Sequence, residues 1–306
     1  MGVRWPAIKQ DKNEPREKDL LMRKIGISTD CMCDLSADFL REKGVEVMQF
    51  YIHTATGRFW NENEITSDNI LEYLESGNTF LRSSVPEPEE CKTYFEGLLD
   101  WYDEVIHITT SDKIGLSHPN AKAALELMED AGKRVTLINS GSISAGLGHM
   151  VLLAVALRDS GKTAAEIVGA CVSVRKKISG SFIVPNTDYL YRIGYVGQGM
   201  KALCDVLGIH PVLYAKNGKF TIKSFRTGSY EKAVMRYIRS ELRRSDKIDK
   251  KQLFIAHAGC PAKIISRVRD KVEDLNIFDK ITVTRTSAVI SSWCGPGTVG
   301  VMFVYK

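Results

Sequence analysis

Short apolar runs alternate with amphipathic segments across the first half of the chain. KIGIST, VEVMQFYIHT, EVIHIT and RVTLIN are β-rich runs that each predict one strand, and segments between them show helical periodicity. In EPEECKTYFEGLLDWY, for example, Phe95, Leu98, Leu99 and Tyr102 share one helical face. Strands separated by helices of this length need crossover connections, which favour a parallel sheet. The pattern therefore predicts a doubly wound, mostly parallel α/β domain over residues 24–183.

The pattern changes after Pro185. The stretch IHPVLYAKNGKFTIKSFRT holds two β-rich runs joined at Asn217–Gly218, which is a strong hairpin signal. A helix, the strand QLFIAHAG, a second helix, the run ITVTRTSAVI and a final strand VGVMFVY follow. This mixture predicts a C-terminal α+β domain with a β-hairpin over residues 184–306. Residues 1–23 are polar and aperiodic, which predicts a mobile extension.

Charge and composition narrow the possible partners. The formal net charge is +5, and residues 1–24 hold seven Lys/Arg and four Asp/Glu, so the rest of the chain is near neutral. Broad binding to nucleic acid, which needs a concentrated basic footprint, is therefore not expected. No run approaches the ~20 apolar residues of a membrane span, and no apolar secretory segment opens the chain. The seven cysteines are scattered, which favours free thiols and a cytoplasmic location.

Polar segments follow several of the predicted strands, near the point where each strand ends. They are Thr29–Asp30, Ser83–Ser84, Thr109–Ser111 with Gly115–Ser117, and Asn139–Ser142. Ligands of open parallel sheets bind beyond the carboxyl ends of the strands, where helix N-termini favour an anion. The segments therefore predict a site for a carboxylate or phosphate, although the same hydroxyls are also typical helix caps. His118, which begins a helix beside Ser117, is either a ligand contact or a surface residue.

Three further residues are candidate ligand contacts. Gly295, in the Gly-Pro-Gly turn before the last strand, can bring its backbone close to a ligand. Trp293 beside it either lines an apolar pocket or packs in the core. Arg226 follows the predicted hairpin and is placed to approach a head group or phosphate. The helix over residues 230–245 carries a basic face that is either solvated or a docking surface for an acidic partner.

Familiar catalytic signatures are absent from the sequence. It has no G-x-S-x-G elbow, no P-loop and no H-E-x-x-H, and its six histidines are dispersed. We therefore expect neither a catalytic set nor a metal site.

Six segments, in order, resemble the DegV family. STDCMCDLS is similar to that family's S-T-D-S-x-x-D-L-P, RSSVPEPEE to its T-S-Q-P-S, and ITTSDKIGLSHPNAKAA to its I-x-I-S-S-x-L-S-G-T-Y-Q-S-A. INSGSISAGLG, NTDYLYRIGYVGQ with the hairpin region, and VISSWCGPGTVGVMF are similar to three later segments. The resemblance covers residues 24–306.

The resemblance implies a two-domain α/β fold that buries a long-chain fatty acid, without a cofactor or catalysis of its own. It also implies that hydroxyls of Ser83, Ser84 and Ser117 hold the carboxylate, and that the acid is presented to a separate ATP-dependent fatty acid kinase. The sequence departs from the family where Gly115 replaces a serine and Trp293 a histidine. Tyr195 similarly replaces an arginine and His210 a lysine. These departures imply a ligand that is bulkier, less charged or held differently.

Two alternatives to a lipid carrier remain open from the residues. One is an acyl or phosphoryl transferase that uses the strand-end serines, which requires a base beside Ser83 or Ser117. The other is a regulatory protein-interaction module that uses the basic helix.

Overall fold

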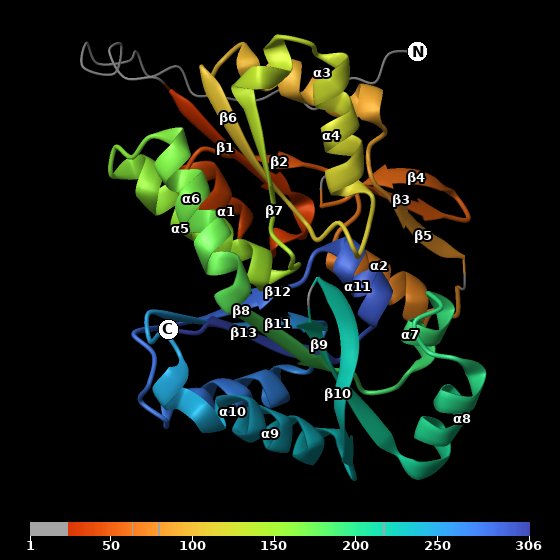
Figure 1. Cartoon of the computed structure of the whole chain (residues 1–306). Coiled ribbons are helices and arrows are strands. Elements are labelled where there is room, and N and C mark those ends of the chain that lie inside the picture. Colours follow the sequence, from red (N-terminus) through yellow and green to blue (C-terminus); the bar gives the residue numbers. More distant parts are fainter. Residues whose placement is uncertain (1–23, 63, 79, 217) are drawn as a thin grey trace.

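Three sheets and their covering helices make up the fold (Figure 1). The computed structural model describes residues 24–62, 64–78, 80–216 and 218–306. The predicted extension over residues 1–23 lies outside the described residues, as does Asn217 of the predicted hairpin turn. The chain is a mixed α/β protein with one parallel sheet and two further sheets, which confirms the predicted fold class.

The first sheet is parallel throughout, in the order β2-β1-β6-β7. Its strands are β1 (Ile25–Asp30), β2 (Val45–Met48), β6 (Glu104–Thr109) and β7 (Val135–Asn139). Alternate residues face opposite ways, so that Ile27 and Ile106 pack on one side while Val105 packs on the other. The first side is covered by α1 (Ala37–Glu42), α5 (Ala145–Asp159) and α6 (Ala164–Val174), and the second by α3 (Pro88–Leu99) and α4 (Ser117–Leu127) (Figure 1). This is the doubly wound arrangement that the sequence predicts.

The second sheet has six strands in the order β10-β9-β8-β13-β11-β12. They are β8 (Ile178–Ile183), β9 (Ile209–Lys216), β10 (Lys219–Thr227), β11 (Gln252–Ala258), β12 (Lys280–Arg285) and β13 (Thr298–Val304). Only the β11–β12 pair is parallel among the described pairings. Helices α9 (Tyr230–Glu241) and α10 (Ala262–Glu273) cover one face. The predicted domain limit after residue 183 falls at the end of β8, although β8 pairs within this sheet.

A third, antiparallel sheet was not predicted from the sequence. It contains β4 (Gly57–Trp60), β3 (Tyr51–Thr54) and β5 (Leu81–Ser84). The run VEVMQFYIHT, predicted as one strand, divides into β2 of the parallel sheet and β3 of this one. No Gly, Pro, Asn or Asp separates the two strands, so that the sequence carries no turn signal at the break. Ser83 and Ser84 therefore lie in an antiparallel strand and not beyond the end of a parallel one.

The remaining helices lie between or beside the sheets. They are α2 (Ser67–Glu75), α7 (Asp188–Arg192), α8 (Gln198–Leu207) and α11 (Ala288–Cys294), with short 3₁₀ turns at Cys31–Cys33, Ala131–Arg134, Arg175–Lys177 and Leu242–Lys247. The run ITVTRTSAVI spans β12 and the start of α11. Within the described ranges, no helix has both the length and the apolar character to cross a membrane.

Alternation along β13 divides the second sheet into two environments. Val299, Val301 and Phe303 pack against the α9 and α10 side. Thr298, Gly300 and Met302 face the other way, toward the first sheet and α11, where they line a cavity. The two sides of one strand therefore serve the core and the candidate site separately.

Candidate functional site

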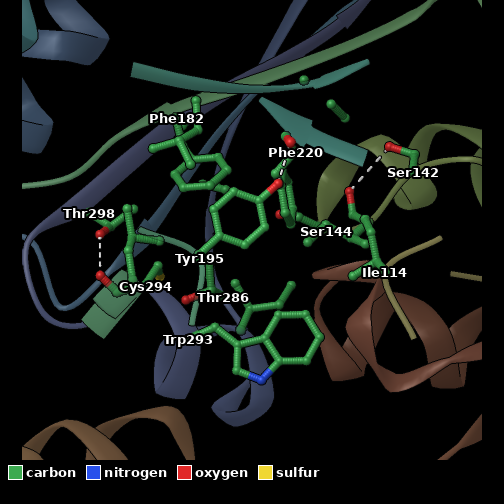
Figure 2. Close-up of a pocket in the computed structure, with 18 of the residues that line it drawn as sticks. Ile114, Ser142, Ser144, Phe182, Tyr195, Phe220, Thr286, Trp293, Cys294 and Thr298 are labelled. Atoms are coloured by element: carbon green, nitrogen blue, oxygen red, sulfur yellow. Dashed lines mark hydrogen bonds between the residues drawn. The ribbon is translucent and has the colours of Figure 1, made fainter. Parts of the chain in front are cut away.

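A cavity of about 470 Å³ lies between the six-stranded sheet and the N-terminal half of the chain. Its floor is formed by alternate residues of β8, β9 and β13 together with Ala256 of β11. Its other walls come from α7, α11, the start of β10 and the loops after β6 and β7. Figure 2 shows four aromatic rings gathered around it, those of Phe182, Tyr195, Phe220 and Trp293. Further apolar wall residues are Ile114, Ile143, Leu190, Ile193, Leu213, Ala215, Ala256, Ile290, Cys294 and Met302.

The aromatic and aliphatic walls leave the cavity open on one side. Ile193 is 44% exposed and Tyr195 38% exposed, so that both lie at the mouth. The Tyr195 hydroxyl donates a hydrogen bond to the backbone oxygen of Phe220, which ties the segment after α7 to β10. Leu213 and Ala256 are buried and lie deeper. A mostly apolar space that opens to solvent fits a ligand with a long apolar part.

Few polar side chains line the cavity, and most of those that do are already hydrogen-bonded. The Thr298 hydroxyl donates to Cys294 O at 2.9 Å. The Ser144 hydroxyl donates to Asp34 Oδ2 at 2.5 Å. With the described residues, the Ser142 hydroxyl makes only a long bond, 3.4 Å, to Ile143 O. Ser142 is therefore the cavity serine whose hydroxyl is most available to a ligand.

A buried carboxyl group, Asp34, lies directly behind the Ser144 hydroxyl. Its Oδ1 accepts a hydrogen bond from the Ser287 N–H at 2.8 Å. Burial raises the pKa of Asp34 to about 7, and the hydrogen bonds from Ser144 and Ser287 oppose that rise only in part. Burial also raises the pKa of the nearby Glu62. The wall behind Ser144 is therefore acidic, and it is a poor place for a second anion.

The structure places Ser83 one side chain away from the cavity. Its hydroxyl accepts a hydrogen bond from Trp293 Nε1 at 3.0 Å, and the Trp293 ring lines the cavity. Ser84 is bonded instead to His53 Nε2 at 2.8 Å. Neighbouring residues of a strand point to opposite faces, so Ser84 is directed away from Trp293.

Three other predicted residues meet in a buried cluster at the carboxyl ends of β1 and β6. The Ser117 hydroxyl donates to Asp30 Oδ1 at 2.8 Å, and the Thr110 N–H donates to Asp30 Oδ2 at 2.6 Å. Thr29 donates its hydroxyl to Ile108 O at 2.9 Å. None of Thr29, Asp30 and Ser117 lines the cavity, and the Ser117 hydroxyl is already used in its hydrogen bond to Asp30. Their observed contacts hold the loop after β6 against β1.

Gly115, His118 and Arg226 also lie outside the cavity wall. His118 Nδ1 lies 3.0 Å from the Thr109 hydroxyl, and burial lowers the pKa of the imidazole. A Cβ added at Gly115 would meet no neighbouring atom within 4 Å. Arg226 bonds to the Ser240 hydroxyl of α9 at 2.7 Å, on the face of β10 that is turned away from the cavity.

The sequence did not single out several residues that line the cavity. Lys113 and Lys219 contribute its charged groups, and Phe182, Leu213 and Phe220 much of its apolar wall. The apolar cavity residues of β9 and β10 could have been found from the alternation of side chains along these strands, because alternate residues lie on opposite faces of the hairpin. Among the described residues, no group of three or more His, Cys, Asp or Glu is placed to hold a metal ion.

Gly295 supports the cavity through its backbone conformation. Its φ is +71°, and an added Cβ would overlap the Tyr189 ring of α7. We expect Gly295→Ala to lower the free energy of unfolding by about 2–4 kcal/mol, because it adds backbone strain to a clash with the partly buried Tyr189 ring. Gly194→Ala is the matched control, since Gly194 has φ +73° but no heavy atom within 4 Å of the added Cβ.

In the control Gly194→Ala, the free energy of unfolding should fall by only about 1 kcal/mol, because alanine is strained in the left-handed backbone conformation. Urea unfolding of both variants measures the difference. Equal losses at the two glycines would contradict a packing role for Gly295.

Comparison with known sequences identifies a family. The model of the DegV family matches residues 24–306. A DegV domain-containing protein from Deinococcus radiodurans is 25% identical over 279 residues, which cover 90% of this chain and 97% of that protein. A DegV domain-containing protein from Clostridium acetobutylicum is 24% identical and is matched over 93% of this chain and 100% of its own length.

Solved structures agree in fold. A DegV family protein from Thermus thermophilus, described as binding fatty acid, has a TM-score of 0.83 and 25% identity, with 92% of this chain and 100% of that chain covered. The fatty acid kinase B3 protein of Streptococcus pneumoniae, solved with linoleic acid, has a TM-score of 0.80 and 17% identity, with 92% and 100% covered. From the match over residues 24–306, we conclude that this chain belongs to the DegV family.

Proposed function

We propose that the protein binds a long-chain fatty acid or a related single-chain lipid and carries it with its tail in the cavity. The observation that carries the proposal is a mostly apolar cavity of about 470 Å³. That volume lies within the range of small-molecule sites, and the wall is mostly hydrocarbon and aromatic. The relative from Thermus thermophilus, which is described as binding fatty acid, supports the same reading.

Burial of the tail supplies the driving force. Each methylene removed from water contributes about 0.8 kcal/mol, so a chain of about 15 methylenes gains on the order of 12 kcal/mol before costs. Immobilising the flexible chain and the loss of free translation offset part of this gain. The apolar wall alone is therefore sufficient for tight binding, and the head group needs only to set orientation and selectivity.

Denaturing extraction of the purified protein, followed by mass spectrometry, tests the proposal. We expect a co-purifying fatty acid or single-chain lipid in amounts comparable to the protein. After delipidation, oleate added in equilibrium dialysis should rebind at one site. A protein that releases no lipid and takes up none would contradict the proposal.

We further propose that the protein acts in the cytoplasm as a non-catalytic carrier, without a cofactor, and presents its lipid to a separate ATP-dependent fatty acid kinase. The resemblance to the Streptococcus pneumoniae protein supports this partner. Asp30 does lie beside the Ser117 hydroxyl as a base would, but that hydroxyl is buried and is not part of the cavity wall, so a lipid in the cavity does not contact it. Oleate-loaded protein and ATP should therefore give acyl phosphate only when a kinase is added. Product formed by this protein alone would favour the transferase alternative.

A further inference from the structure

The proposed function leaves open which end of the cavity holds the head group of the lipid. Resting on that function, we infer that Lys113 and Lys219, assisted by the Ser142 hydroxyl, hold an anionic head group at the mouth of the cavity. The chemistry recognised is a carboxylate or a phosphate on a single long chain.

Charge at the cavity is confined to these two lysines. They are the charged members of the described cavity wall, which contains no Asp or Glu. Both side chains are exposed, so their ammonium groups keep contact with water. Within the described part of the chain, neither lysine forms an ion pair. An anion at the mouth would therefore meet positive charge that has no protein partner to compete for it.

Ser111 brings the three head-group residues to the same end of the cavity. Its N–H donates to Ser142 O at 2.9 Å, and its hydroxyl donates to Gly218 O at 2.7 Å. One buried residue thus links the loop that carries Lys113, the loop that carries Ser142, and the turn that precedes Lys219.

The contact between Gly218 and the loop after β6 is close. A Cβ added at Gly218 would lie 2.5 Å from the Ser111 hydroxyl and 3.6 Å from Lys113 Cδ. The aliphatic stem of Lys113 therefore runs beside the turn that begins β10. Gly218 also has φ +81°, which favours glycine at this position.

The other polar groups of the cavity are unsuited to an anion. The hydroxyls of Ser144 and Thr298 are already donated, the first of them to the carboxyl group of Asp34. In Figure 2, Thr298 and Cys294 lie on one side of the aromatic rings, and Ser142 and Ile114 on the other. A carboxylate or phosphate without a partner is costly to bury, whereas an alkyl chain is not. The tail therefore extends past the rings and the head group stays with the lysines.

Paired ligands with the same tail test the assignment. Delipidated full-length protein is dialysed against oleate, oleyl phosphate and oleyl alcohol, whose heads are a carboxylate, a phosphate and a neutral hydroxyl. We expect the wild-type protein to bind the better anionic ligand about tenfold more tightly than the alcohol, as a partly exposed ion contact allows. The ratio of oleate to oleyl phosphate affinity shows which anion the site prefers.

Removing the charge should remove the preference and nothing else. In Lys113→Gln/Lys219→Gln, the advantage of the anion should fall to about twofold or less, while affinity for the alcohol stays unchanged. Lys263→Gln, an exposed lysine on α10 behind the opposite face of the sheet, is the matched control and should behave as wild type. Ser111→Ala should weaken binding of the anions but not of the alcohol, because loss of the hydrogen bond to Gly218 leaves the lysines misplaced. Ser111→Thr keeps a hydroxyl and should bind the anions as the wild type does.

The outcomes separate the two levels of the proposal. Failure of all three ligands to bind the wild-type protein overturns the lipid-binding function together with the head-group assignment. Equal binding of the alcohol and both anions by the wild-type protein overturns the assignment alone. The same holds if the double lysine variant keeps its preference for an anion.

Discussion

Replacing Ala256 by leucine is expected to weaken lipid binding on the order of 100-fold while the protein remains folded. Ala256 is a buried residue of β11 whose side chain faces the cavity, opposite Gly300 of β13. The three added carbons would occupy space that the lipid tail needs, so that about three methylenes lose their burial, or about 2.4 kcal/mol before any strain. Because the added atoms fill an existing space, the thermal midpoint should stay the same or rise.

Two further variants make this result specific. Ala262→Leu places the same change at an exposed position of α10 and should leave binding unaltered. Ala215→Phe enters the cavity from β9 and should reproduce the loss from a different wall. Equilibrium dialysis with oleate measures binding, and thermal unfolding checks the fold. Wild-type affinity in both Ala256→Leu and Ala215→Phe would place the lipid elsewhere.

The second large effect is expected from Asp34→Asn, which should stabilise the protein increasingly as pH rises from about 4 to 7. Burial raises the pKa of Asp34 from 3.8 to about 7. The unfolded chain therefore releases this proton at lower pH than the folded protein does, and the free energy of unfolding of the wild type falls across that window. A rise of roughly three pKa units corresponds to about 4 kcal/mol at most.

Asparagine fits the same contacts without a charge. Its Oδ1 can accept from the Ser287 N–H, and its amide can donate to the Ser144 hydroxyl, which now donates to Asp34. Urea unfolding at pH 4.5 and pH 8 gives the difference between variant and wild type at each pH. Relative to strongly acidic pH, we expect the variant to gain only about 1 kcal/mol over the wild type at pH 4.5 and up to about 4 kcal/mol at pH 8.

The comparison between variant and wild type also removes the effect of other titrating groups. Burial lowers the pKa of His149 to about 4, so the folded protein loses stability as pH falls through the same window. This loss is the same in the variant and the wild type, and it therefore cancels in the difference between them. Asp38→Asn, at an exposed position near the start of α1, is the control and should show no comparable pH dependence. A difference for Asp34→Asn that does not change with pH would show that Asp34 is ionised throughout.

Much of the fold follows from patterns that lie within short segments. The runs around Ile27, Ile106 and Ile138 are apolar enough to predict buried strands, and the helices between them carry clear apolar faces. Asn217–Gly218 likewise predicts the hairpin of β9 and β10. These features depend on neighbours in sequence, which is why the sequence suffices for them.

The break between β2 and β3 depends on packing between distant segments. Tyr51 pairs with Ser84 and Trp60 in the small sheet. Residues 49 and 50 carry no sequence signal that the chain leaves the parallel sheet at this point. Similarly, Ser83 and Ser117 were predicted to contact the ligand because their hydroxyls are suited to hold a carboxylate. Their hydroxyls are nevertheless committed to Trp293 and Asp30, which only the folded chain reveals.

The lysines at the mouth are the least predictable part of the candidate site. A single exposed lysine has no distinctive sequence context, and Lys113 and Lys219 are more than one hundred residues apart. What gives them a shared role is the contact of Ser111 with Gly218 and Ser142, which joins three loops. A contact of this kind between distant loops produces no periodic pattern in the sequence, so it cannot be predicted from one.

The wall of the cavity is assembled from segments scattered between Lys113 and Met302, so no part of it survives unfolding. A ligand that binds only the folded form therefore stabilises the entire molecule by mass action, by about 4 kcal/mol when its free concentration is about 1,000 times the dissociation constant. An empty molecule opens more often than a loaded one, and it is exposed to proteases for longer. We therefore expect the supply of the proposed lipid to set how long each copy of the protein persists.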